Sequence, residues 1–176
     1  MITNEVQRFY DPTFTVTKEY KDSLPDLQNG PASLIEGANV PIQQVGISNF
    51  KLPLKFRRRE GEPVTLEASI DGYVSLEKDK KGINMSRIMR TFYKFQDKVF
   101  HIDRLEEILK AYKEDLGSQE SFLRVSFNYP LLKDSLRSGM KGYQYYKVQL
   151  EGRLDNYDQF QKHMHLDFEY SSACPC

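Results

Sequence analysis

A run of strictly alternating apolar and polar residues constrains the fold of this chain most strongly. Within residues 65–76, every second position is apolar or small: Leu66, Ala68, Ile70, Gly72, Val74 and Leu76. Successive side chains of a β-strand point to opposite faces of the sheet. The pattern therefore predicts a strand with one buried face and one polar face.

Two helical segments follow this strand. Residues 86–95 can place Ile88, Met89, Phe92 and Phe95 on one helical face, and the next segment carries Leu105, Ile108, Leu109, Tyr112 and Leu116 at helical spacing. Asp103 and Glu106 resemble a capping box, and Gly117 stands where a left-handed residue ends a helix. These signals predict two consecutive helices.

Strand patterns lie on both sides of the helices. An extended segment begins near residue 45, and Pro53 confines it to a sheet edge, a bulge or a strand boundary. Alternation returns over residues 123–129, 146–154 and 163–170. The order predicts an α+β fold, with an antiparallel sheet that carries two helices on one face. Residues 1–40 show no sustained period and predict an extended arm, and residues 41–176 predict one module.

The charge balance excludes some classes of partner. Lysine plus arginine and aspartate plus glutamate both total 25, so no net charge attracts nucleic acid or an anionic membrane over long range. We interpret the basic run at residues 55–59 as part of a solvated turn. No apolar stretch approaches the roughly 20 residues of a membrane span, and no signal peptide is recognisable, so we expect a cytoplasmic protein.

Both cysteines of the chain, Cys174 and Cys176, stand in its last five residues. A thiolate is the form of cysteine that attacks carbon or binds metal. Two thiols that flank Pro175 cannot easily bridge to each other, which fits a reducing compartment. The pair is the strongest chemical candidate in the sequence. The alternative is two exposed thiols in a frayed tail.

Two further segments are candidate sites. If residues 163–170 form a strand, His163, His165, Asp167 and Glu169 share one face and could hold a divalent metal. The water-facing side of an antiparallel strand is the simpler explanation of the same residues. Residues 81–87 contain a turn glycine, a capping Asn84 or Ser86, and Arg87 in the first turn of a helix. Such a helix start can bind phosphate, but most capped helix starts bind nothing.

Several motifs, in order, resemble the type IB GTP cyclohydrolase family. They are Asp26-Leu27-Gln28-Asn29, Val45-Gly46-Ile47-Ser48-Asn49-Phe50, Lys81-Gly82-Ile83-Asn84-Met85-Ser86-Arg87 and Ser172-Ala173-Cys174-Pro175-Cys176. The resemblance runs from about Asp26 to Cys176. It implies a tunnelling fold (T-fold), in which modules assemble around a channel and active sites form where modules or subunits meet.

The resemblance also implies a reaction. GTP is converted to 7,8-dihydroneopterin triphosphate and formate when a metal-activated water attacks C8 of the purine, in folate or related pterin and deazapurine pathways. It implies that Cys174 is a metal ligand and catalytic residue, with Cys176 as second choice. The expected metal is zinc, manganese or iron, and the expected assembly is a homo-oligomer, a tetramer.

Two departures from the family pattern affect the interpretation. Asn84 stands where the family more often has histidine, and the second module of the family is absent from this chain. The sequence therefore predicts the N-terminal module of such an enzyme, which alone binds metal poorly and does not open GTP.

Two alternatives stay open at this point. One is a non-catalytic assembly module that associates through exposed strands near Tyr143, Tyr145 and Tyr146. The other is a related tunnelling-fold pterin enzyme in which His163 and His165 bind the metal.

Overall fold

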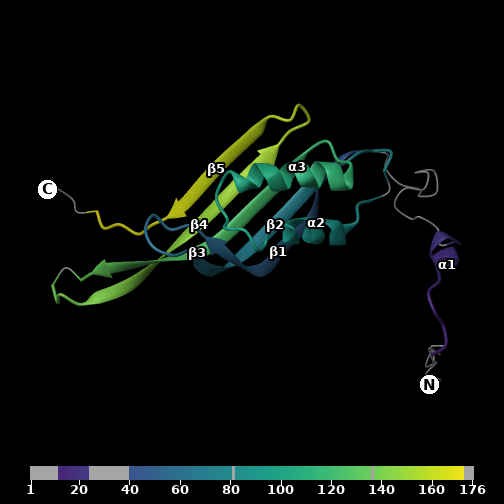
Figure 1. The fold of residues 1–176 in the computed structure, drawn as a ribbon. Helices are drawn as coiled ribbons and strands as arrows, with labels where there is room; N and C mark the ends of the chain where they lie inside the picture. The colour runs from purple at the N-terminus through teal and green to yellow at the C-terminus, as the bar shows by residue number, and fades with distance from the viewer. Residues whose placement is uncertain (1–11, 24–39, 81, 136, 173–176) are drawn as a thin grey trace, which may run out of the picture.

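The computed structural model describes residues 12–23, 40–80, 82–135 and 137–172. Five antiparallel strands form one sheet in the order β1-β2-β3-β4-β5, which is also their order along the chain (Figure 1). They span Ile42–Phe56 (β1), Val64–Leu76 (β2), Ser121–Asp134 (β3), Lys141–Leu154 (β4) and Phe160–Asp167 (β5). Each strand therefore pairs with its neighbours in sequence, although β2 and β3 are joined through two helices and not by a hairpin turn.

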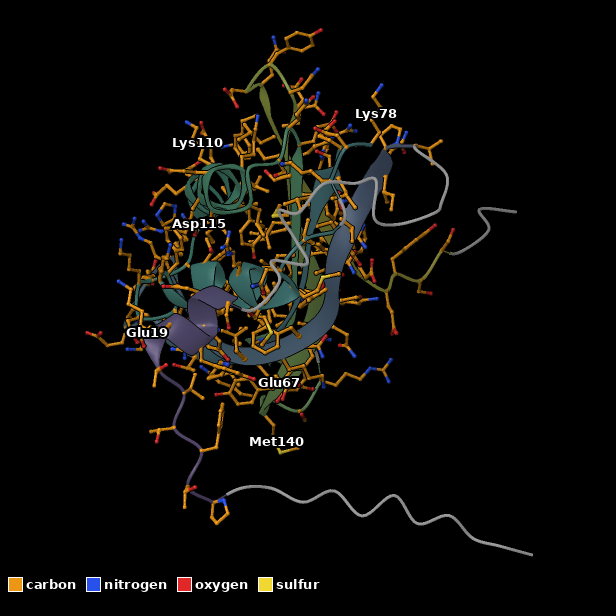
Figure 2. The ribbon with its side chains drawn as sticks, turned by 90° about the vertical axis from the view of Figure 1, so that its right-hand side faces the viewer. Glu19, Glu67, Lys78, Lys110, Asp115 and Met140 are labelled. Carbon is orange, nitrogen blue, oxygen red and sulfur yellow. The ribbon has the colours of Figure 1, made fainter. Side chains whose placement is uncertain are left out.

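Helices α2 (Met85–Tyr93) and α3 (Arg104–Leu116) lie between β2 and β3 in the sequence. Figure 2 shows both helices on one side of the sheet. The architecture is thus the predicted α+β fold, an antiparallel sheet with two helices on one face, consistent with a tunnelling-fold module. Among the described residues, no helix is long and apolar enough to cross a membrane.

The core lies between the helices and the sheet. The strands contribute alternate residues, which include Ala68, Ile70, Val74, Leu123, Val125 and Leu154, and the helices contribute Ile88, Phe92, Leu105, Ile108, Leu109 and Tyr112. Leu52, Leu54 and Phe56 extend the core under the edge strand β1. The predicted alternation in β2 is confirmed, because its burial changes with every residue.

The helix boundaries confirm one predicted signal and correct another. Gly117 ends α3 in the left-handed region with φ 60°, where glycine is favoured. Asp103 precedes α3, but its side chain makes no cap hydrogen bond, so the predicted capping box is wrong. Its carboxylate instead accepts a hydrogen bond from Lys162 Nζ at 2.6 Å. The Asp103 carboxylate thus binds a side chain of β5 and not a backbone N–H at the start of α3.

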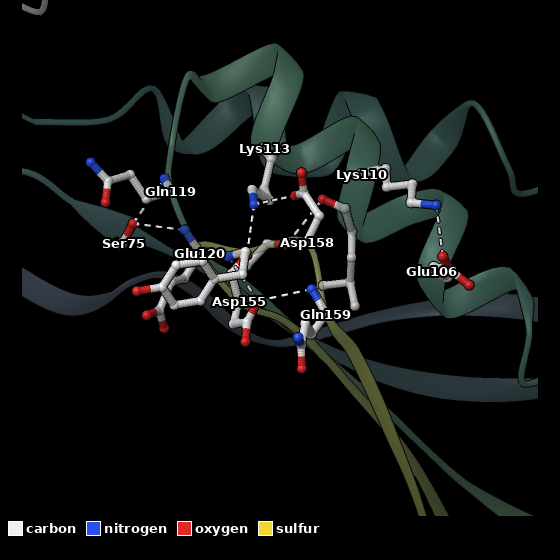
Figure 3. A network of polar contacts seen from close by, with 12 residues as sticks. Ser75, Glu106, Lys110, Lys113, Gln119, Glu120, Asp155, Asp158 and Gln159 are labelled. Atoms are coloured by element: carbon white, nitrogen blue, oxygen red, sulfur yellow. Dashed lines mark hydrogen bonds and ion pairs between the residues drawn. The ribbon is translucent and has the colours of Figure 1, made fainter.

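Polar contacts at one end of the sheet fix α3 to the turns around it (Figure 3). Lys113 Nζ donates to the carbonyl oxygen of Asp155 at 2.7 Å and pairs with the Asp158 carboxylate. Ser75 Oγ accepts from the backbone N–H of Gln119 at 3.1 Å and of Glu120 at 3.0 Å. The loop that leaves α3 is therefore held between the β4–β5 turn and the end of β2.

The β3–β4 hairpin extends beyond the rest of the sheet. Pairing of β2 with β3 ends at Ala68↔Phe127, whereas β3 and β4 stay paired as far as Asp134↔Lys141. The residues of this extension are mostly exposed, and Tyr143 is 62% and Met140 69% exposed. The hairpin is a two-stranded arm without core of its own.

The last strand differs from its prediction in length and in burial. β5 ends at Asp167, so Phe168, Glu169 and Tyr170 lie beyond it. Met164 and Leu166 were expected on a buried face, yet they are 65% and 48% exposed. The alternation correctly predicted a strand, but Lys162 already contacts Asp103 at the start of α3, so Met164 and Leu166 lie beyond the part of β5 that the helix covers.

The extended N-terminal segment predicted for residues 1–40 stays a prediction, because much of it lies outside the described residues. Within residues 12–23 the structure shows α1 (Lys18–Ser23), a short helix that buries no residue.

Candidate functional site

A row of charged side chains crosses the helix-free face of the sheet. Asp71 on β2 is in register with Arg124 on β3, and Arg124 is in register with Glu151 on β4. Arg124 donates from Nε and Nη2 to Glu151 Oε2 at 3.1 and 3.0 Å, and its Nη1 lies 4.0 Å from Asp71 Oδ2. One guanidinium thus stands between two half-buried carboxylates. The row offers hydrogen-bond acceptors that can orient a polar ligand.

A bulge in β1 continues this row. The register between β1 and β2 shifts between Ile47 and Phe50, and Asn49 adopts a positive φ of 55°. Ser48 Oγ and the Asn49 backbone N–H both donate to Asp71 Oδ1 at 2.8 Å, so the carboxylate holds the bulge in place. The bulge falls in the Val45–Phe50 motif that the sequence analysis had singled out without a structural reason.

The histidines of β5 lie at the other end of the row. His165 Nε2 is 3.8 Å from Glu151 Oε2, and the ring centroids of His163 and His165 are 6.5 Å apart. Asp167 turns to Lys147 on β4, 3.8 Å away, and Glu169 lies beyond the strand. The four candidate ligands therefore do not converge. In the described part of the chain, no group of three or more His, Cys, Asp or Glu side chains could hold a metal ion.

The start of α2 confirms the predicted cap. Asn84 is the N-cap, and its side-chain oxygen accepts from the Ser86 N–H at 3.2 Å. Arg87, which could have contributed to a phosphate site, donates from Nη1 to the carbonyl oxygen of Asp115 at 3.1 Å. Its guanidinium is therefore engaged at the end of α3.

Asp115 is the centre of the contacts between the helices, and Figure 2 shows it on the helix side of the sheet. Its carboxylate accepts from Lys94 Nζ at 2.7 Å and from the Thr91 hydroxyl. The hydrogen bond from Lys94, followed by the one from Thr91, lowers the pKa of Asp115 below its ordinary value. The aspartate is thus held in its charged form.

A polar cleft of about 450 Å³ lies where β5 ends. It is lined by Gln144, Tyr145, Tyr146, Lys147, Asp167, Phe168 and Glu169. Cys174, the predicted catalytic residue and metal ligand, and Cys176 lie outside the described residues, so their predicted roles stay predictions.

Comparison with known proteins identifies the family. The family model described as "Type I GTP cyclohydrolase folE2" matches residues 24–176. This chain belongs to the FolE2 family. The match corrects the resemblance described above. The matching family model and the relatives are those of folE2. The interpretation of the chain as the N-terminal part of a type IB enzyme that ends at the Cys-Pro-Cys motif is therefore wrong.

Relatives in this family agree over nearly the whole chain. A protein named GTP cyclohydrolase FolE2 from Dinoroseobacter shibae is 56% identical over 169 residues, which cover 96% of this chain and 46% of the relative. Proteins of the same name from Roseobacter denitrificans and Paracoccus denitrificans are each 52% identical over 171 residues, which cover 46% and 53% of those relatives.

The chain thus spans about half the length of the curated FolE2 relatives that it matches. Because those relatives align with nearly all of it, the comparison gives no support to the prediction that this chain is a catalytically incomplete module.

Sequence reasoning missed the row from Asp71 to Glu151. Each of its members was correctly placed on the polar side of a strand, but strand alternation alone does not say which residues of different strands are neighbours. The available signal in the sequence was that each of three predicted strands carries one of these charged residues near its middle. Only the pairing register joins the three into one row.

Proposed function

We propose that this protein acts in the GTP cyclohydrolase reaction of folate biosynthesis. GTP and water yield 7,8-dihydroneopterin triphosphate and formate, because the purine ring opens at C8 and that carbon leaves as formate. The observation that carries the proposal is the family match over residues 24–176, together with relatives named GTP cyclohydrolase FolE2 at 50% identity or more.

A divalent metal ion fits this proposal through the chemistry of Cys174. When bound, such an ion supplies a water of lowered pKa as nucleophile. The thiolate of Cys174 is a suitable donor for zinc or iron, with manganese as the third candidate. The described residues hold no group of three or more ligands, so Cys174 is proposed as one ligand of a larger set.

The polar face is proposed to orient the substrate. Glu151 and Asp71 present carboxylate oxygens on either side of Arg124, and such oxygens accept hydrogen bonds from the N–H groups of a guanine ring. In this role they position GTP and do not transfer the reacting proton.

A chimera tests the reaction. This chain replaces the aligned stretch of the Dinoroseobacter shibae relative, to which it is 56% identical. We expect the chimera to release formate from GTP and to form a fluorescent pterin after oxidation. An inactive chimera that is folded, beside an active parent relative, contradicts the proposal.

A matched pair of variants tests the metal ligand in the same chimera. Cys174→Ala should lose stoichiometric metal by elemental analysis as well as activity, whereas Cys176→Ala should keep both. Retention of metal in Cys174→Ala removes Cys174 from the site. Loss of metal in His163→Ala/His165→Ala instead favours the alternative pterin enzyme.

We also propose that the protein is a homo-oligomer, a tetramer, and that a non-catalytic assembly role is the second candidate. Both outer strands, β1 and β5, have an edge without a partner strand among the described residues. Tyr143 and Tyr145 on the arm are 62% and 69% exposed. An oligomer in which neither the chain nor the chimera opens GTP favours that second role.

A further inference from the structure

A groove runs between the β1–β2 turn and the outer half of β3. Its volume is about 340 Å³, and it is lined by Arg58, Arg59, Glu60, Tyr129, Pro130, Leu131, Leu132 and Tyr143. We call it the arginine groove. One wall is the charged turn, and the other consists of four consecutive residues of β3 with Tyr143 from β4 opposite Leu132.

The arginine groove follows an open strand edge. Beyond Phe127, β3 pairs with β4 on one side only, because its ladder with β2 ends at Ala68↔Phe127. Within the described sheet, the backbone groups of β3 on the groove side therefore have no ladder partner. Because the four consecutive residues 129–132 of β3 line the arginine groove, the groove runs along this strand. An extended peptide segment is the ligand that fits such an edge.

The charge of the turn selects an acidic segment. Lys55 near the end of β1 and Arg57, Arg58 and Arg59 on the turn outnumber Glu60 and Glu62. None of the four cationic side chains has a hydrogen bond or ion pair to another described residue. Nearby charges on the arm are already paired, since Lys141 lies 3.7 Å from Asp134 and Lys133 bonds to the Tyr146 hydroxyl. The unpaired guanidinium groups are thus free to bind carboxylates.

This chain carries a segment with the required chemistry. Directly after β5, which ends at Asp167, the acidic Glu169 stands between the aromatic residues Phe168 and Tyr170. Phe168 and Tyr170 are 64% and 80% exposed, and the Glu169 carboxylate has no partner among the described residues. In an extended backbone the Glu169 carboxylate would face the arginines while the two aromatic rings face the opposite way, toward the apolar wall.

The arginine groove and the segment after β5 lie at the same end of the sheet. Lys147 on β4 is in register with Asn128 on one side and with Asp167 on the other. Tyr129 and the groove residues after it, like Phe168 and the residues after it, lie beyond this level. The two features are thus separated by the width of the β3–β4 arm, roughly 10 Å for two strand spacings.

We propose that two copies of this chain associate by exchange, so that residues 168–170 of each copy lie along β3 in the arginine groove of the other. A two-fold axis near the arm satisfies both contacts at once, because each copy offers both surfaces at one end. This interface does not depend on the proposed GTP chemistry.

Charge reversal tests the proposal on the whole chain by sedimentation. Arg58→Glu/Arg59→Glu and Glu169→Lys should each weaken self-association by about tenfold or more, because each places like charges opposite one another. The control Lys78→Glu/Lys110→Glu makes the same change in charge as the arginine variant but at the end of the molecule away from the β3–β4 hairpin (Figure 2), and it should associate as the parent does.

Mixing the two reversed proteins gives the decisive result. In the mixture each groove meets a segment of opposite charge, so association should return as a heterodimer, although neither protein associates alone. Unchanged association of either variant, or no association in the mixture, overturns the proposal. A parent that is monomeric by sedimentation also overturns the proposal, even if it binds a synthetic peptide of residues 165–172.

Discussion

At the scale of single residues, Tyr112 is the least expected side chain of the core. It is fully buried between α3 and the sheet, and its hydroxyl has no hydrogen-bond partner within the described part of the chain. Burial raises the pKa of Tyr112 well above its ordinary value, so the phenol stays neutral. The sequence marks Tyr112 as a core residue, but it gives no sign that its hydroxyl is unsatisfied.

Tyr112→Phe should therefore leave stability unchanged or raise it by up to about 1 kcal/mol, because it removes an unpaired buried hydroxyl and keeps the ring. Tyr112→Ala is the control and should cost about 3–5 kcal/mol through the cavity that it leaves. Urea denaturation measures both. A loss of more than about 1 kcal/mol in the phenylalanine variant means that the hydroxyl does have a partner.

Gly72 lies against the same tyrosine. A Cβ atom at Gly72 would stand 2.9 Å from Ile88 Cγ2 and 3.1 Å from the Tyr112 hydroxyl. Gly72→Ala should thus destabilise the protein by about 1–3 kcal/mol through overpacking. Combined with Tyr112→Phe, the loss should be smaller than the sum of the single changes, since the removed oxygen makes room. Strict additivity in denaturation experiments would show that the contact with Ile88 dominates.

At the scale of helices and strands, the polar contacts of Asp115 join the two helices to each other. Residues of α2 and of the turn after it, namely Arg87, Thr91 and Lys94, all bond to Asp115 near the end of α3. Helical periodicity predicted both helices and their apolar faces. It does not predict how the helices are joined, because these partners are more than 20 residues apart.

Asp115→Asn should lower stability by about 1 kcal/mol at neutral pH, since the charged acceptor of Lys94 is lost. The folded-state pKa of Asp115 is lowered, so its stabilising contribution is complete above the unfolded pKa of about 3.9 and is lost as the pH falls through the folded value. Denaturation of parent and variant should therefore differ at pH 7 and converge in strong acid. A difference that does not change with pH excludes the ion pair as the cause.

At the scale of the whole molecule, the core and the association surfaces are separate. The hydrophobic core lies under the helices, whereas the arm and the end of β5 carry exposed apolar residues such as Leu132 and Phe168. The arm should thus contribute little to the stability of one copy.

Replacement of residues 131–144 by Asn-Gly should shorten the arm while keeping Pro130 opposite Tyr145, because a two-residue turn preserves this register. We expect the unfolding free energy of one copy to change by no more than about 1 kcal/mol, as for other exposed changes. Self-association should weaken, since Leu131, Leu132 and Tyr143 leave the arginine groove. Sedimentation with denaturation measures both effects, and a large loss of stability contradicts the separation.

The sequence by itself determined the elements, the fold class and the buried faces. These depend on periods of two and 3.6 residues that are written locally, as in β2 and α3. Its motifs also pointed to GTP cyclohydrolases, although the family was corrected to FolE2.

Only the tertiary structure decided which residues of different elements meet. The row of Asp71, Arg124 and Glu151 requires the register of three strands, the ion pair of Asp103 with Lys162 displaces a local cap, and the arginine groove exists because β2 parts from β3 at Phe127. Such contacts depend on the arrangement of the whole chain, and no local sequence pattern encodes that arrangement.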